Sequence, residues 1–148
     1  MTELYGWLQD HAAAMLDLLY DVGADLVVFP AEGGGPTIVP AGTPPPFVSV
    51  HFAADRPLGG RLTMLSTRFR MRSYAHCVGA NDIAARAVSD LVAAAWLDVR
   101  PVILGRSVYP IRSELSRDDP RPDQSTGTQY VTITDTYRLE SDNGVGGS

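Results

Sequence analysis

The sequence predicts a single α+β domain in which a long β-hairpin leads directly into an amphipathic helix. Three observations predict this class: period-two alternation over residues 61–77, helical spacing over residues 83–97, and further alternation over residues 128–139. A chain of 148 residues fits one domain that buries roughly two thirds of its unfolded surface. We expect the domain to span residues 1–141 and residues 142–148 to form a disordered tail.

The alternating segment Arg61–Cys77 predicts a half-buried strand with arginines on its polar face. A strand of this length reaches about 50 Å, so it either bends across the sheet or projects from the body. The apolar face carries Leu65, Phe69, Met71, Ala75 and Cys77. The polar face carries Ser66, Arg68, Arg70, Arg72, Tyr74 and His76.

The helix after this strand is expected to lie on the apolar face of the sheet. Asn81 or Asp82 can accept hydrogen bonds from its first free amides, and Asp82 suits the positive end of the helix dipole. The predicted apolar side consists of Ile83, Ala87, Val88, Leu91, Ala94, Ala95 and Leu97.

The N-terminal part predicts a helix that Thr2 caps and Gly23 ends, followed by a short buried strand over residues 24–29. Residues 30–46 are rich in Pro and Gly and form a long loop, which either merely connects or has a function. Residues 47–54 predict a strand, joined to the arginine-bearing strand by turn residues 55–60. Candidate docking residues in this loop and hairpin are Pro36, Ile38, Pro44, Asp55, Arg56, Leu58 and Arg61.

The C-terminal third predicts short strands and loops. Residues 98–105 turn and enter a short strand, and residues 107–115 form another, in which Pro110 indicates a sheet edge or a bulge. Residues 116–127 are polar and predict a surface loop. The last strand, over residues 128–139, places Val131, Ile133, Tyr137 and Leu139 on one face. Its other face carries Tyr130, Thr132, Thr134, Thr136 and Arg138.

Charge is segregated along the chain. Residues 1–60 hold seven acids and one base, residues 61–112 hold eight bases and three acids, and the remainder holds seven acids and three bases. Every basic residue is arginine, which reflects either GC-rich coding DNA or a preference for protein contacts. The net charge of −5 disfavours tight nucleic-acid binding.

The Arg68, Arg70 and Arg72 stripe admits three interpretations. It is a solvated strand face, it pairs with the acidic N-terminal third of an adjacent subunit, or it faces nucleic acid.

The sequence contains no pattern typical of an enzyme. Nucleophile-elbow, P-loop and zinc-protease motifs are missing from it. His51 and His76 sit on strands that can pair, but His76 and Cys77 point to opposite faces, so we expect no metal and no cofactor. Cys77, the only cysteine, excludes an internal disulfide and fits a reducing compartment. No apolar run approaches the roughly 20 residues of a membrane helix, and acidic Glu3 disfavours a signal peptide.

From Ala75 to Leu139 the chain resembles tail terminator (tail completion) proteins of long-tailed, siphovirus-type actinobacteriophages. The matching elements are the VGAND turn into a helix, the DVRPVILGR connection, the VYPIRSE strand, a Ser/Asp/Pro loop and a closing YRL strand. The N-terminal order of helix, loop and PPFVSV strand is similar but less specific.

This resemblance implies a mostly antiparallel, twisted sheet backed by two helices on one face, and a hexameric ring. Such a ring caps the head-proximal end of the tail tube, stops its growth and docks the head-completion protein. The implied partners are further copies of the chain, the tail tube protein, the head-completion or connector protein, and genomic DNA that passes through the lumen without specific binding. The implied location is the virion neck, after assembly in the host cytoplasm, and Arg68, Arg70 and Arg72 would face a neighbouring subunit or the lumen.

Two alternatives remain open. The chain is another neck protein, such as a head-closure or head–tail joining protein, or it belongs to a different class, a small cytoplasmic nucleic-acid-binding module. Salt-sensitive DNA affinity would distinguish the last of these.

Overall fold

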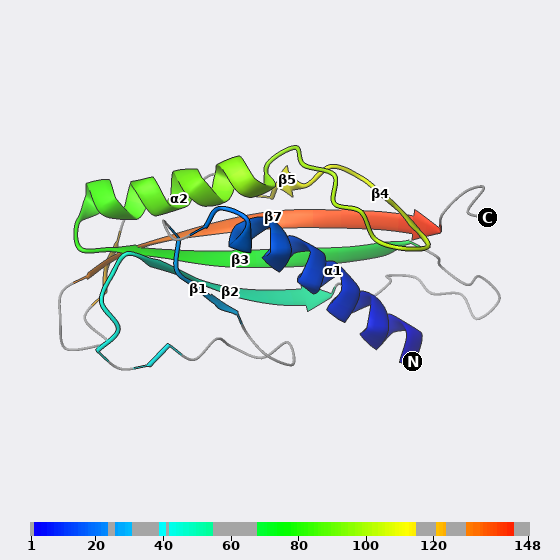
Figure 1. Cartoon of the computed structure of the whole chain (residues 1–148), viewed down its shortest axis with the longest axis horizontal. Coiled ribbons are helices and arrows are strands. Elements are labelled where there is room, and N and C mark those ends of the chain that lie inside the picture. Colours follow the sequence, from blue (N-terminus) through cyan, green and yellow to red (C-terminus); the bar gives the residue numbers. More distant parts are fainter. Residues whose placement is uncertain are drawn as a thin grey trace.

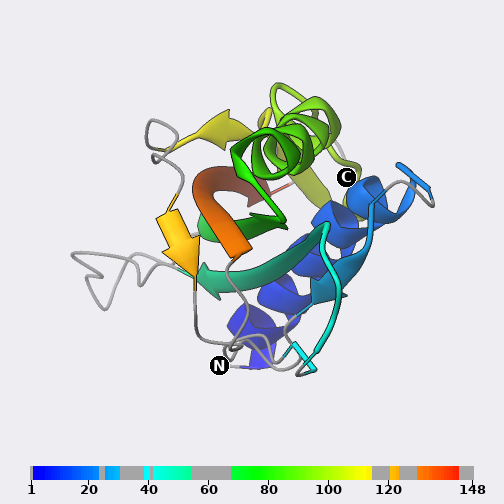
Figure 2. The same ribbon diagram turned by 90° about the vertical axis from the view of Figure 1, so that its left-hand side faces the viewer.

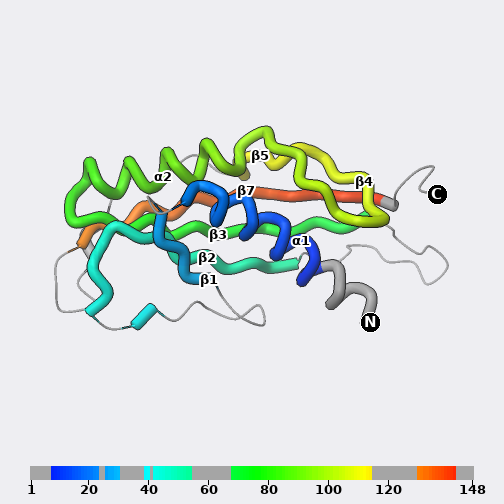
Figure 3. Tube along the Cα trace, in the orientation of Figure 1, coloured from blue at the N-terminus to red at the C-terminus, as the bar shows by residue number. Residues whose placement is uncertain are grey.

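The computed structural model describes residues 2–23, 26–30, 39–40, 42–54, 68–114, 121–123 and 130–143. Two helices and seven strands lie within these residues (Figures 1 and 3). The elements are α1 (Thr2–Tyr20), β1 (Val28–Pro30), β2 (Phe47–Ala54), β3 (Phe69–Gly79), α2 (Asp82–Trp96), β4 (Arg106–Val108), β5 (Arg112–Ser113), β6 (Arg121–Asp123) and β7 (Tyr130–Asn143).

The strands form one sheet, which confirms the predicted α+β class. Its order is β1-β2-β3-β7-β4, and β5 and β6 also pair with β7. β1 runs parallel to β2, while every other pairing is antiparallel. β7 therefore has β3 along one edge and three short strands in succession along the other.

Both helices lie on the same side of the curled sheet, and the core lies between them and the sheet (Figure 2). Trp96 of α2 is fully buried, and its indole N–H donates to the Met15 carbonyl of α1 over 2.9 Å. The Trp96 ring also meets the Tyr137 ring of β7 edge to face, with centroids 5.2 Å apart. Trp96 thus joins both helices to the central strand. Its burial also contributes much of the core's stability, because large aromatic side chains bury a large apolar area.

Several polar side chains also lie in the core, each with a hydrogen-bonding partner. His11 of α1 is fully buried, with its Nε2 2.7 Å from the Ser141 hydroxyl of β7, and Arg106 donates to the same hydroxyl over 3.1 Å. Ser89 of α2 donates to the buried Asp135 carboxylate. Buried polar groups need such partners because an unsatisfied one costs about 1–3 kcal/mol.

The predicted apolar side of α2 is partly wrong. Ile83 is 80% exposed and Leu97 is 43% exposed. The buried side of α2 is rotated relative to the prediction. It is centred on Val92 and the large Trp96, and small alanines lie on either side of them. The buried residues are Ala85, Val88, Ser89, Val92 and Trp96. Asn81 is the N-cap, and its side chain accepts from the Ala84 amide over 2.8 Å.

Strand boundaries follow the predictions closely in some places and depart from them in others. β2 has the predicted bounds, and Gly23 takes a φ of +94° after α1. The buried strand predicted over residues 24–29 is the shorter β1, and no strand occurs in residues 98–105. The predicted strand over residues 107–115 is interrupted around Pro110, which has no amide hydrogen to donate to a ladder, and divides into β4 and β5.

Two C-terminal predictions are corrected. The segment predicted as a loop over residues 116–127 contains β6, which pairs with β7. β7 continues to Asn143, two residues into the predicted tail, because Asp142 and Asn143 pair with β4. No helix in these described ranges is long and apolar enough to cross a membrane.

Gly79 ends β3 where the first turn of α2 lies against the strand. A Cβ at this position would lie 2.3 Å from the Ala85 backbone nitrogen and 2.6 Å from the Ala84 carbonyl carbon. These are backbone atoms of a capped helix, so they cannot move aside as a flexible side chain would. Only glycine fits here.

We predict that Gly79→Ala lowers the free energy of unfolding by about 2 kcal/mol or more through this clash. Gly105→Asn is the comparison, since Gly105 has a φ of +78° and open space around its Cα, and Asn tolerates such a φ. Urea unfolding followed by circular dichroism measures both. Equal stability of the Gly79 variant and the wild type would contradict the close approach.

The connection from α2 to β4 alternates between buried and exposed apolar residues. Ile103 is 7% exposed, whereas Val102 is 94% and Leu104 is 99% exposed. Ile103 therefore anchors the connection to the core and presents its two neighbours to solvent.

We predict that Ile103→Ala costs about 2–4 kcal/mol of stability because it removes core contacts and leaves a cavity. Val102→Ala and Leu104→Ala, in the same connection, should change stability by less than about 0.5 kcal/mol. The midpoints of urea unfolding test this difference. A Leu104 variant as unstable as the Ile103 variant would show that the connection packs differently.

Candidate interaction surface

The arginine stripe lies on the sheet face opposite the helices. Phe69 and Met71 of β3 are buried in the core beneath the helices, and successive strand residues point to opposite faces. Arg70 and Arg72 therefore project from the other face, and Arg68 precedes them just before β3 begins. The predicted strand face is confirmed for residues 68–77, while residues 61–67 lie outside the described part.

The register of β3 against β7 places carboxylates beside these arginines. Arg70 lies opposite Glu140, and its Nε is 3.2 Å from a Glu140 carboxylate oxygen. Arg68 contacts the same oxygen from 3.1 Å, and Arg138 contacts the second oxygen from 3.4 Å. Glu140 is thus held by three guanidinium groups.

A second carboxylate extends the cluster. Glu114 follows β5, and its oxygens lie 3.6 Å from an Arg72 nitrogen and 3.7 Å from an Arg138 nitrogen. Arg138 therefore bridges the two glutamates. We call the four arginines Arg68, Arg70, Arg72 and Arg138, together with Glu114 and Glu140, the basic face.

The arginines of this face are more exposed than the glutamates. The exposed side-chain fractions are 57% for Arg68, 45% for Arg70 and 41% for Arg72. They fall to 14% for Glu140 and 20% for Glu114. The carboxylates lie beneath the guanidinium groups, so the surface offered to solvent is positive.

The structure describes one of the remaining predicted docking residues. Pro44 is exposed in the segment before β2. The others, Pro36, Ile38, Asp55, Arg56, Leu58 and Arg61, lie outside the described residues, so those predictions stay predictions.

Sequence analysis missed Glu140 and Glu114 as members of the site. The last strand was expected to stop at Leu139, one residue before Glu140, and Glu114 stood unassigned in a predicted edge strand. Arg138 was placed on the correct polar face of β7. The alternation of each strand shows which residues lie on its polar side. Only the register of β3 against β7 shows which charged residues lie next to each other.

A stack of aromatic rings continues along the same sheet face. The His51 ring lies on the Tyr74 ring with centroids 4.6 Å apart, and on the His76 ring with centroids 5.2 Å apart. His76 Nδ1 is 3.0 Å from the Thr134 hydroxyl oxygen. Cys77 lies fully buried on the opposite face, as predicted. The residues that the structure describes contain no cluster of three or more metal-ligating side chains.

Burial lowers the pKa of both histidines. Desolvation lowers the pKa of His51 from its usual 6.5. Desolvation, and then the charge of His51, lowers the pKa of His76. Two stacked imidazoles resist protonation because each cation would be poorly solvated and would repel the other.

Known proteins share the fold of this chain. No family model and no curated protein matches the sequence. A chain in the structure of the virion of a native gene transfer agent particle matches with a TM-score of 0.60 and 14% identity, covering 89% of this chain and 94% of that chain. A second solved protein, which carries no functional name, matches with a TM-score of 0.63 and 14% identity over 97% of both chains. At this identity the likeness shows the fold alone.

We predict that the histidine stack makes the protein less stable in mild acid. Because the folded-state pKa values lie below the unfolded value, the unfolded chain binds more protons as the pH falls below about 6.5. The stability that the two neutral histidines contribute is complete above that pH. It is lost as the pH falls through their folded-state pKa values. Melting temperatures between about pH 7.5 and about pH 5.5 should fall more for the wild type than for His51→Gln/His76→Gln. Parallel curves for the two proteins would contradict this role.

Proposed function

We propose that this protein is a structural component of a phage-like virion and acts there as a tail terminator. In this role a ring of subunits caps the head-proximal end of the tail tube, stops tube growth and provides the docking surface for head-completion proteins. The observation that carries the proposal is the fold shared with a component of a gene transfer agent virion over nearly the whole of both chains.

The motifs of the tail-terminator resemblance fall on structural features of this fold. The VGAND segment contains Gly79, which permits the close start of α2, and Asn81, which caps it. The DVRPVILGR segment is the connection that Ile103 anchors, and VYPIRSE covers the interrupted edge formed by β4 and β5. These matches therefore support a common scaffold. They are sequence observations, so they add to the structural similarity with the gene transfer agent chain.

The exposed surfaces suit a protein that works through contacts. The positive basic face lies on one side of the sheet, and exposed Val102 and Leu104 lie on a connection anchored by one buried residue. In the proposed ring such surfaces meet neighbouring subunits, the tube protein or the head-completion protein, while DNA passes through the lumen.

A nucleic-acid-binding module is the second candidate, and the basic face is the observation that favours it. Against it stand the net charge of −5 and the two glutamates within the face. If DNA were the ligand, its affinity would fall steeply with salt, because phosphate contacts release counterions.

The direct test uses tail tubes assembled from the major tail protein of the same virion. We expect the purified protein to bind one end of each tube in negative-stain electron micrographs, and tubes polymerised in its presence to be shorter. The reason is that a ring on the growing end blocks further addition of tube subunits. A tube protein from an unrelated phage is the control.

Other outcomes distinguish the alternatives. Binding to portal-containing heads, with bare tube ends, would identify another neck protein. Unchanged tube lengths and no density at either end, together with salt-sensitive DNA affinity, would replace the proposal with the nucleic-acid module.

A further inference from the structure

We propose that the basic face binds the acidic side of α1 in a second copy of the chain. This inference rests on the proposed function, which requires a closed ring of subunits. The basic face and the acidic side of α1 would be the two surfaces that meet in that ring.

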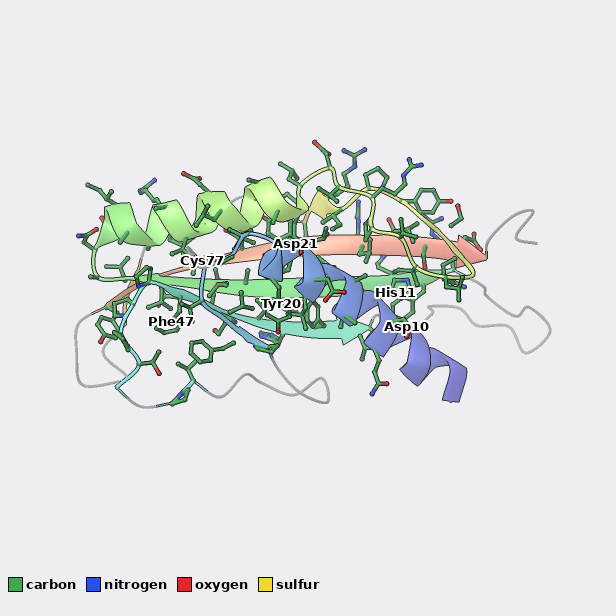
Figure 4. All side chains as sticks on the ribbon, viewed as in Figure 1. Asp10, His11, Tyr20, Asp21, Phe47 and Cys77 are labelled. Carbon is green, nitrogen blue, oxygen red and sulfur yellow. The ribbon has the colours of Figure 1, made fainter. Side chains whose placement is uncertain are left out.

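The acidic side of α1 is formed by Asp10, Asp17 and Asp21, all exposed. Residues spaced by seven and eleven positions return to within about 20° of the same line on a helix. Asp21 follows the last residue of α1, but its amide still bonds the Asp17 carbonyl, so it continues the helical line. Figure 4 labels Asp10 toward the N-terminal part of α1 and Asp21 at its opposite end.

No lysine or arginine occurs in α1, so nothing on this helix offsets the acidic line. The other helix differs. On α2, Arg86 stands one turn from both Asp82 and Asp90, and spacings of four allow opposite charges to compensate each other. Among the described helices, α1 is therefore the acidic complement to the basic face.

The two surfaces also match in length. From Asp10 to Asp21 the helix rises about 16 Å. From Arg68 to Arg72 the strand extends about 13 Å. An α1 laid along β3 would bring carboxylates near guanidinium groups over the full stripe. A guanidinium has five donors, so one arginine can contact more than one carboxylate, as Arg138 does with Glu114 and Glu140.

The two surfaces lie on opposite sides of the molecule. Figure 2 shows α1 on the helix side of the sheet. The basic face is on the other side, because Phe69 and Met71, which alternate with its arginines, are buried beneath the helices. They cannot meet within one chain. Contacts between different patches on successive copies are heterologous, and they close into a ring when the rotation between copies permits.

The test measures molar mass by light scattering after size exclusion, over a range of protein concentrations. In low salt the wild type should exceed the monomer mass at high concentration. In high salt it should return to the monomer, because exposed ion pairs are screened. Asp10→Asn/Asp17→Asn/Asp21→Asn should remain a monomer in both conditions.

A matched control separates this contact from a change in net charge. Ile83→Arg/Ala87→Arg/Ala94→Arg changes the net charge by the same +3 as the asparagine variant, but at exposed positions of α2. This variant should associate as the wild type does. Circular dichroism confirms that each variant is folded.

Charge exchange provides the specific test. Asp10→Arg/Asp17→Arg/Asp21→Arg and Arg68→Glu/Arg70→Glu should each be monomeric alone, since each presents like charges to itself. An equal mixture should associate again, because the basic helix of one meets the acidic stripe of the other. If the arginine variant does not fold, the asparagine variant and its α2 control still decide the outcome.

Three results would overturn the inference: a wild type that stays monomeric in low salt, equal association of the asparagine variant, or equal loss in the α2 control. A basic face that binds duplex DNA in preference to a second copy would also overturn it. None of these results removes the proposed function, because that depends on capping of tail tubes.

Discussion

The antiparallel pairing of β3 with β7 is the constraint on which the rest of the structure depends. It joins the 11 residues of β3 to the C-terminal strand, and one register sets both faces of the sheet at once. On one face it aligns buried Cys77 with buried Ile133, beneath the helices. On the other it aligns Arg70 with Glu140. A shift of one residue would turn the polar side chains of the shifted strand into the core, so the charge cluster and the core are specified together.

Much of the fold could be predicted from local sequence patterns. The two faces of β3 follow from period-two alternation, the bounds of β2 follow from an apolar run that ends at turn residues 55–60, and Asn81 with Asp82 marks the start of α2. The buried side of α2 was harder to predict because the helix is rich in alanine. Ala87 and Ala94 suit a core or a surface equally well, so hydrophobicity does not determine the rotation of the helix. Packing of Trp96 against Tyr137 and the Met15 carbonyl determines it, and that contact joins distant parts of the chain.

The candidate surface was predictable in kind but incomplete in membership. A strand pattern shows that Arg68, Arg70 and Arg72 share a face, because it depends on neighbours in sequence. It cannot show that Glu140 approaches from 70 or more residues away. The same reason explains why the buried polar groups were missed. His11 and Ser141 look like surface residues in sequence, and only their meeting across the core satisfies them.

β7 is made after every other element that the structure describes, and this order has a consequence for synthesis. During translation, β3 emerges long before β7. Until β7 emerges, the apolar face of β3 and its arginines lack the β7 residues that pair with them. Domains whose contacts join distant segments complete their folding late. A nascent subunit therefore lacks a finished sheet until its last strand has left the ribosome. Any contact that needs the finished sheet is therefore available only to chains that extend through β7.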